Sequence, residues 1–344
     1  MLRRVEFDCS RIEDIDSFDA FQSSPKLLIV RLSYSEGHWS TPGHQSSLLP
    51  WRQLQKITFD GPVDIILDIL QESLDLRVLD VTIRGEKSQQ GRGSSTRNNS
   101  LHELRVNDCN GESGVLFLSL TLPALQMVSL NFAGGEFPGD EMISFVVQSK
   151  ISHSLEILSL SFGRYHYGPR PTIKTHDIIR CLKSMPNVSD LSLHDRSKAK
   201  YLDTFNGLDT LGDITLILWD LRWDIEVPVL PNLKRFAITG PQKMSWSVVE
   251  EMVTSRWRNV SQAVGEYVQL ESVEVNWLGA CAHPKSSLTR LSDSRLEAAD
   301  ASVLARLRLY QNEGLRLMGP IDEVDSECAE CIQRRVRSGD WEGC

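Results

Sequence analysis

The stretch LPALQMVSLNF, at residues 122–132, decides the fold of this 344-residue chain. Leu125, Val128 and Leu130 follow the spacing LxxLxL, which ends in strict alternation. Alternation with a period of two places the apolar side chains on one face of a β-strand and the intervening ones on the other. Pro123 cannot extend a preceding helix and favours extended neighbours, so the stretch predicts a strand that follows a turn.

The same spacing recurs eleven times, with other aliphatic residues or Phe accepted at the Leu positions, at intervals of 22 to 37 residues. The copies begin at Leu2, Leu27, Leu54, Leu76, Leu101, Leu125, Leu155, Val188, Leu211, Leu233 and Leu270. Runs with helical spacing of apolar residues lie between several copies, at residues 63–74, 141–151 and 176–185. A repeat of this length and pattern is typical of leucine-rich repeats. The sequence therefore predicts an α/β fold: an irregular leucine-rich-repeat solenoid, with a curved parallel sheet and with helices and loops on its convex side.

The repeat is irregular because the Asn or Cys that normally follows the phrase is present once, as Cys109. We expect one solenoid over residues 1–318, in which residues 85–100 form a flexible insertion that lacks apolar residues. Near its end we expect a helix at 245–259, a strand from Leu270, a helix ended by Gly314 and a short strand at 315–320. The charged segment 319–344 is expected to be a disordered tail.

Composition restricts the classes of partner. The net charge of −9 and the isoelectric point near 5.5 disfavour a sequence-independent grip on nucleic acid. No apolar run approaches a membrane span, and the first residues lack an apolar signal segment. Seven scattered cysteines suit reduced thiols. We therefore expect an intracellular protein, in the cytoplasm or the nucleus, with neither nucleic acid nor membrane as its partner.

The sequence contains few motifs for catalysis, cofactor binding or metal binding. The chain has neither a GxSxG nucleophile motif nor a glycine-rich phosphate loop ending in Lys-Ser or Lys-Thr, so we expect no enzyme and no cofactor. Cys328 and Cys331 form the only metal-like pair. A structural zinc site needs four ligands, and Cys281, His283 or Cys344 would have to complete it. Loose cysteines in a tail are the ordinary alternative.

The better candidate for a functional site is the concave face of the expected sheet, where the third, fifth and seventh positions of each phrase should point. These positions carry charges of both signs and small polar residues, as a protein-binding surface can. They lack the basic stripe with stacking aromatics that nucleic acid would need. The alternative is that this face is merely solvated. The candidate partner-binding residues are Arg31, Lys56, Asp80, Glu103, Arg105, Asn107, Asn131, Asp190, His194, Arg235 and Glu274.

Several stretches also resemble a known family. LPWRQLQKITFDGP (49–62), SLEILSLSF (154–162), MPNVSDLSLHD (185–195) and LPNLKRFAITGP (230–241) are similar to segments of basidiomycete fungal F-box/leucine-rich-repeat proteins. So is the C-terminal combination of MVTSRWR (252–258), LESVEV (270–275) and RLRLYQNEGLRL (306–317). The resemblance covers roughly residues 48 to 318.

The resemblance implies a function. Proteins of this family dock through an F-box on a Skp-type adaptor of a cullin ubiquitin ligase, and their repeats are taken to recruit substrates. No F-box-like segment precedes Leu27, so an adaptor is expected only if an F-box lies upstream. Two readings stay open: a non-enzymatic substrate-recognition domain, or a free-standing leucine-rich-repeat scaffold or inhibitor with no role in ubiquitin transfer.

Overall fold

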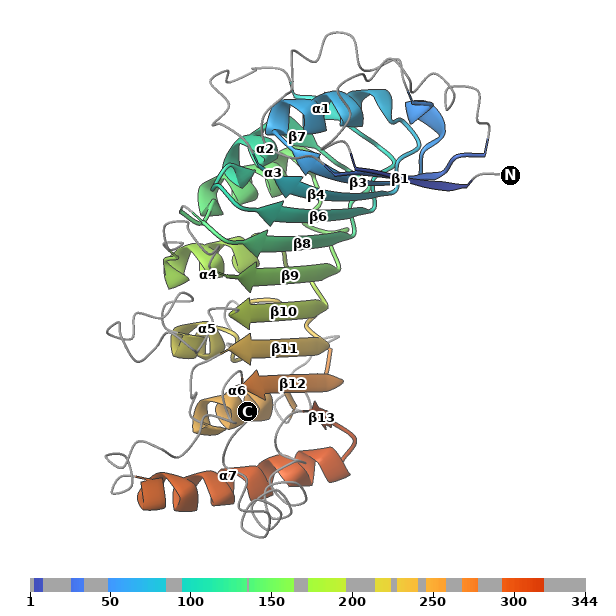
Figure 1. Ribbon diagram of the computed structural model, residues 1–344. Helices are drawn as coiled ribbons and strands as arrows, with labels where there is room; N and C mark the ends of the chain where they lie inside the picture. The colour runs from blue at the N-terminus through green and yellow to red at the C-terminus, as the bar shows by residue number, and fades with distance from the viewer. Residues whose placement is uncertain are drawn as a thin grey trace.

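A large parallel sheet organises the molecule, as the computed structural model shows (Figure 1). The structure describes residues 3–8, 26–33, 49–84, 95–134, 136–163, 173–195, 214–223, 228–240, 246–257, 268–277 and 293–318. The sheet has eleven strands in the order β1-β2-β3-β4-β6-β8-β9-β10-β11-β12-β13, and each strand is parallel to its neighbours. The predicted α/β class with a parallel sheet is therefore confirmed.

The strands are short and of similar length. They are β1 (Arg4–Asp8), β2 (Ile29–Ser33), β3 (Lys56–Gly61), β4 (Val78–Ile83), β6 (Glu103–Asp108), β8 (Met127–Phe132), β9 (Ile157–Phe162), β10 (Asp190–Asp195), β11 (Arg235–Gly240), β12 (Ser272–Trp277) and β13 (Arg316–Met318). Ten of the eleven predicted copies of the phrase lie at the start of one of these strands, and β13 is the predicted last strand.

All the strands share one register. The second residue of each six-residue strand pairs with the second residue of the next, as Leu104 pairs with Leu79 and with Val128. This row of side chains is completely buried from β3 to β9. Because the side chains of a strand alternate between faces, the row two residues further along is buried as well, and together the two rows form the sheet side of a continuous core.

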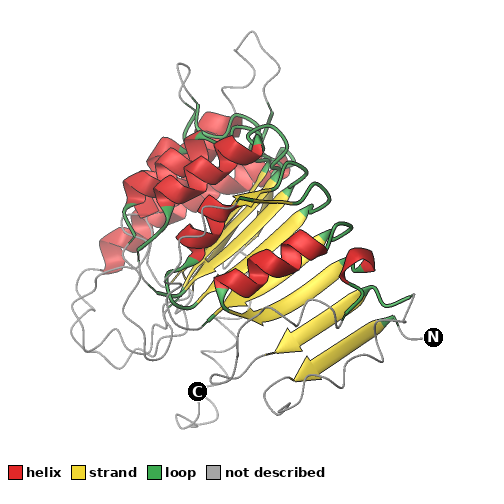
Figure 2. Ribbon diagram, turned by 90° about the horizontal axis from the view of Figure 1, so that it is seen from above, coloured by secondary structure: helices red, strands yellow, loops and turns green. Residues whose placement is uncertain are grey.

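Helices form the second layer. They are α1 (Val63–Glu72), α2 (Ser113–Ser119), α3 (Gly139–Ser149), α4 (Thr175–Lys183), α5 (Ile214–Asp220), α6 (Trp246–Trp257) and α7 (Asp293–Asn312), and a short 3-10 helix, η4, spans Trp51–Gln53. Consecutive helices are neighbours from α1 to α7. Figure 2 shows the helices gathered on one side of the sheet, whose strands succeed one another as a twisted stack.

Helix α1 illustrates why the intervening segments become helical. Pro62 is extended and immediately precedes the first helical residue, where its missing N–H is harmless. Asp64 in the first turn suits the positive end of the helix dipole. Val63, Ile66 and Leu70 recur at helical spacing and are fully buried, so the helix presents one apolar stripe to the sheet.

Polar contacts fix α7 onto α6 at the C-terminal end of the stack. The guanidinium of Arg306 donates two hydrogen bonds to the carboxylate of Glu250, with Nη2 2.8 Å from Oε2. The hydroxyls of Thr254 and Tyr310 lie 2.9 Å apart. These contacts attach the last described helix to the row of helices.

One predicted strand is wrong. The copy at Leu211 predicted a strand, but Ile214–Asp220 is helix α5, and β10 pairs directly with β11. Ile217, Leu218 and Leu221 are fully buried, whereas Leu216, a key residue of the presumed phrase, is 51% exposed. The pattern of burial therefore follows the spacing of a helix and not the alternation that the strand prediction required. The intervals of 23 and 22 residues around this copy belong to one long repeat.

The predicted flexible insertion is partly structured. Residues 85–94 lie outside the described part of the chain, but β5 (Thr96–Arg97) pairs in parallel with β7 (Leu120–Thr121). The buried amide of Asn98 donates to the carbonyls of Leu70 and Ser73 at 3.3 and 2.7 Å. The end of the expected insertion is thus a packed element. The tail 319–344 also lies outside the described residues.

Candidate partner-binding face

The face of the sheet opposite the helices carries three rows of side chains, which we call rows A, B and C; together they form the open face. Row A contains Arg4, Ile29, Lys56, Val78, Glu103, Met127, Ile157, Asp190, Arg235, Ser272 and Arg316. Row B contains Glu6, Arg31, Thr58, Asp80, Arg105, Ser129, Ser159, Ser192, Ala237, Glu274 and Met318. Row C contains Asp60, Thr82, Asn107, Asn131, Ser161, His194, Thr239 and Asn276.

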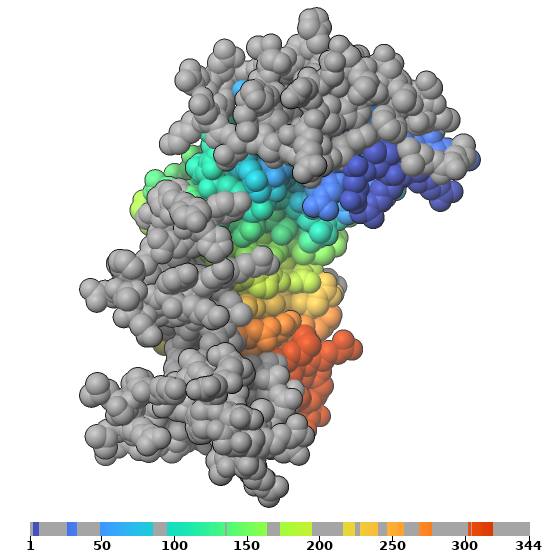
Figure 3. Space-filling model, viewed as in Figure 1, coloured from blue at the N-terminus to red at the C-terminus, as the bar shows by residue number. Residues whose placement is uncertain are grey.

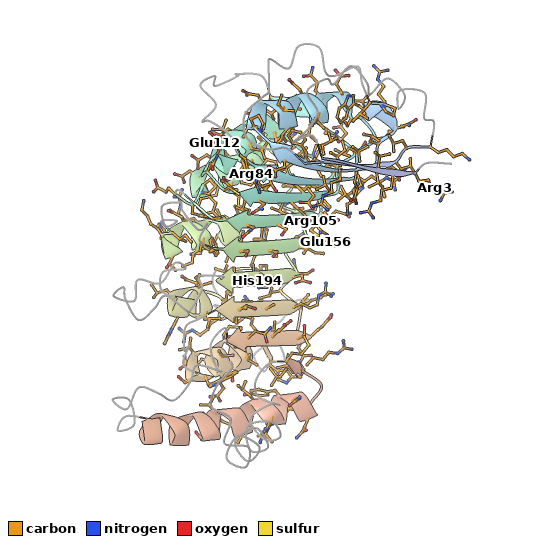
Figure 4. The ribbon with its side chains drawn as sticks, viewed as in Figure 1. Arg3, Arg84, Arg105, Glu112, Glu156 and His194 are labelled. Carbon is orange, nitrogen blue, oxygen red and sulfur yellow. The ribbon has the colours of Figure 1, made fainter. Side chains whose placement is uncertain are left out.

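All eleven residues that the sequence singled out lie on this face. Lys56, Glu103, Asp190 and Arg235 are in row A; Arg31, Asp80, Arg105 and Glu274 are in row B; Asn107, Asn131 and His194 are in row C. They are half-buried or exposed, and Figure 4 labels Arg105 and His194 among them. The space-filling view shows the described residues as a continuous band from the N-terminal to the C-terminal end of the stack (Figure 3).

Three of the six Lys and Arg side chains in rows A and B, those of Arg4, Arg105 and Arg235, form an ion pair with a neighbouring acid. Nε of Arg235 donates to Oδ2 of Asp190 on the adjacent strand at 2.8 Å, and this hydrogen bond raises the pKa of Arg235. Arg105 bonds to Glu103, two residues before it on the same strand. Since both pairs are partly exposed, they contribute little to stability and mainly fix the positions of the side chains.

Arg31, Lys56 and Arg316 differ from these, and the first two are on neighbouring strands. Among the described residues, no ion pair involves Arg31 of β2 or Lys56 of β3. Their strands are neighbours, so the two side chains form a small positive area near the N-terminal end of the sheet. In this area the open face can offer unpaired charge to a partner.

Row C contains a chain of side-chain amides. Nδ2 of Asn131 donates to Oδ1 of Asn107 at 2.7 Å, and Nδ2 of Asn107 is 3.5 Å from Oγ1 of Thr82. The chain links β4, β6 and β8, and it aligns the two predicted asparagines. Oδ1 of Asn131 and Oγ of Ser161 are buried and accept or donate no hydrogen bond within the described residues.

A half-buried carboxylate lies at the end of row C that is nearer the N-terminus. Asp60 is 3.3 Å from Nε of Arg84. Burial raises the pKa of Asp60, and the positive charge of Arg84 partly opposes that effect. Figure 4 places Arg84 near the carboxyl ends of the strands, where row C lies.

Sequence reasoning missed three polar residues that hold the repeats in place. The carboxylate of Asp108, fully buried at the end of β6, accepts hydrogen bonds from four successive backbone N–H groups, those of residues 110–113, and so shapes the turn into α2. The guanidinium of Arg256 donates to the backbone carbonyls of Leu221, Val229 and Leu230. Asn232 donates to Oδ1 of Asn187 at 3.0 Å, which links two strand-entry turns. The Pro-Asn pairs of MPN and LPN were a usable signal for this last contact.

Other predictions about sites lie outside the described residues. Cys281, His283, Cys328, Cys331 and Cys344 are all outside, so the zinc alternative stays a prediction. In the described ranges no cluster of three or more His, Cys, Asp or Glu side chains could hold a metal ion.

Membrane spans can be assessed over the same ranges. None of the described helices is sufficiently long and apolar to cross a bilayer.

Comparison with known proteins does not assign the chain to a family. No protein-family model matches it, and no curated protein is significantly similar to it.

Proposed function

We propose that this chain is a non-enzymatic protein-binding domain of the leucine-rich-repeat type and that it binds its partner on the open face. The observation that carries the proposal is the shared register of the eleven strands, which arranges polar side chains of both signs in three rows on the side opposite the helices. A broad surface of this kind suits recognition by shape and polar contacts.

Geometry supports a curved stack whose open face is concave. Neighbouring strands lie about 4.8 Å apart, whereas packed helices need about 8–10 Å. Since the helices are neighbours along the whole stack, the helical side has to be longer than the strand side. A sheet with a longer outer layer bends around its open face, which would then enclose a partner.

The charge distribution supports a protein partner over nucleic acid. The pairs Arg235–Asp190 and Arg105–Glu103 neutralise most of the central charge, and the whole chain has a net charge of −9. Nucleic acid would require cations that remain free to contact successive phosphates.

Binding through the open face can be tested with three substitutions there. Lys56→Glu reverses a charge whose register neighbours, Ile29 and Val78, are uncharged. Arg105→Gln and Arg235→Gln remove charge without placing two acids side by side. The matched control is Lys183→Glu on the exposed surface of α4.

The assay is a pull-down from extract of the source cells with quantitative mass spectrometry, alongside thermal unfolding of each variant. We expect the triple variant to lose the proteins that wild type and Lys183→Glu retain, at an unchanged melting temperature. Equal retention by all three folded proteins would contradict the proposal.

The resemblance to F-box/leucine-rich-repeat proteins makes the substrate-recognition part of a cullin-type ubiquitin ligase the favoured role within this proposal. Its test is to map the true 5′ end of the transcript, read the frame upstream of Met1, and assay the resulting protein for a co-purifying Skp-type adaptor. An F-box with a bound adaptor would support the ligase role. A stop codon upstream with no adaptor would favour the scaffold or inhibitor reading, which keeps the open face and drops the ubiquitin connection.

A further inference from the structure

The centre of the open face contains a row of small side chains. Ser129, Ser159, Ser192 and Ala237 follow one another in register in row B on β8, β9, β10 and β11. Each is only half-buried. On either side of this small-residue row run the larger side chains of row A and the polar side chains of row C. Short side chains here let a ligand approach the backbone of four strands closely.

A second observation, independent of side-chain size, points to a ligand at the same place. Ser161 belongs to row C, two residues after Ser159 on the same strand and therefore on the same face. It is 5% exposed, and its hydroxyl has no hydrogen-bond partner within the described residues. Its register neighbour Asn131 also leaves Oδ1 without a donor. Buried polar groups in folded proteins are almost always hydrogen-bonded, so two neighbouring exceptions indicate a missing partner group.

The chemistry of the surroundings defines that partner group. On the open face, β8 and β9 carry no charged side chain. Met127 and Ile157 of row A are half-buried and apolar. The nearest charges are Asp190 and Glu103, the register neighbours of Ile157 and Met127, and each is paired with an arginine, Arg235 or Arg105. A ligand here should therefore be uncharged, with an apolar group over row A and hydrogen-bonding groups toward row C.

An extended peptide meets these conditions at once. Its backbone offers N–H groups, which Asn131 Oδ1 lacks, and carbonyl oxygens, to which the Ser161 hydroxyl can donate. Three strand spacings of about 4.8 Å give a row about 14 Å long, which corresponds to about four residues of extended chain.

We propose that the small-residue row from Ser129 to Ala237 is the docking site for an uncharged, extended peptide segment of the partner, with one apolar side chain over Met127 and Ile157. This inference rests on the proposed function, because it names the part of the open face that takes the peptide and the kind of peptide it takes.

The test uses a phage-displayed library of random short peptides, selected on the full chain. Affinities of the recovered peptides are then measured by fluorescence anisotropy on wild type and variants. Ser159→Trp fills the middle of the row, and Ser129→Tyr fills it from the next strand if the first variant does not fold. Thr58→Trp is the matched control, because Thr58 is in the same row B on β3, outside the small-residue row.

We expect uncharged peptides that lose roughly tenfold or more in affinity on Ser159→Trp or Ser129→Tyr and keep their affinity on Thr58→Trp. Ser161→Ala should weaken them roughly three- to tenfold, which a hydroxyl with only a structural role would not do.

Results that overturn the docking site can be distinguished from results that overturn the proposed function. Recovery of no peptides, or of peptides that bind Ser159→Trp as well as wild type, overturns the docking site. If retention of proteins in the pull-down still depends on Lys56, Arg105 and Arg235, the proposed function stands without the docking site. If those partners show no such dependence either, both ideas fall.

Discussion

Arg256 should be essential for the stability of the C-terminal half of the sheet. It lies in the last turn of α6, is 1% exposed, and donates hydrogen bonds to the carbonyls of Leu221, Val229 and Leu230. Its Nη1 is 3.0 Å from the oxygen of Leu230. The perturbation is Arg256→Met, which keeps much of the side-chain volume and removes every donor.

The magnitude follows from two opposing effects. A hydrogen bond from a charged donor contributes about 1.5–3 kcal/mol, so three give about 5–9 kcal/mol. Burial lowers the pKa of Arg256 from the usual value of an arginine to about 10. At 1.36 kcal/mol for each pH unit, that corresponds to about 3 kcal/mol against the buried charge. We therefore expect Arg256→Met to reduce the free energy of unfolding by about 2–6 kcal/mol.

Two measurements check this expectation. Urea unfolding followed by circular dichroism gives the loss of stability, and hydrogen exchange at residues 228–240 reports local opening if the repeats do not unfold together. The matched control is Arg222→Met, because Arg222 is only half-buried, pairs with Glu251 and lies over the ring of Trp219, so that its loss should remain below about 2 kcal/mol. A loss for Arg256→Met no larger than for Arg222→Met would refute the reasoning, since the carbonyls would then not depend on the guanidinium.

Three more outcomes are expected. Asp108→Ala leaves four backbone N–H groups without an acceptor and should lower the free energy of unfolding by about 2–4 kcal/mol in urea titrations, and an unchanged midpoint would count against the turn-shaping role. Burial raises the pKa of Asp60 above 3.8, so the native state holds this proton more tightly than the unfolded state. The free energy of unfolding of wild type should thus fall as pH rises from about 3.8 through the raised pKa of Asp60. Asp60→Asn should remove this contribution to the pH dependence. Identical pH dependence of stability in wild type and Asp60→Asn would contradict the expectation. Burial raises the pKa of Cys181 from 9.0 to about 12, so iodoacetamide at pH 9.0 should alkylate it only after unfolding in urea, as mass spectrometry can show. Alkylation at equal rates in the native and unfolded chain would be the opposite result.

The sequence predicted the sheet well because each strand is decided locally. In phrases such as LPALQMVSLNF a proline-containing turn and strict alternation agree, and burial follows the alternation residue by residue. The placement of the eleven candidate residues followed from the same alternation, so it required no knowledge of the packing.

The sequence predictions failed where tertiary packing, and not the local sequence, determines the structure. Around Leu211 the phrase contains Ile214, Leu216 and Leu218, which fit a strand, yet Ile217 and Leu218 face the core together. Only contacts with the flanking helices choose between the two readings. The roles of Asn98 and Arg256 were equally hidden, because their carbonyl partners lie roughly 25 to 35 residues away along the chain. The small-residue row required the register between strands, which the phrases alone do not give.

The constant register has a consequence for how such a chain can change its length. Removing the segment between equivalent residues of two neighbouring strands, for example residues 104–127, would delete one strand of the large sheet together with helix α2 and the short strand β7. The sheet would become shorter by one strand spacing of about 4.8 Å, and every remaining side chain would keep its face and its row. An insertion of one residue within a strand would instead exchange the two faces beyond it. Whole-unit duplication and loss are therefore the tolerated changes, and by them the open face can be lengthened or shortened without disturbing its rows.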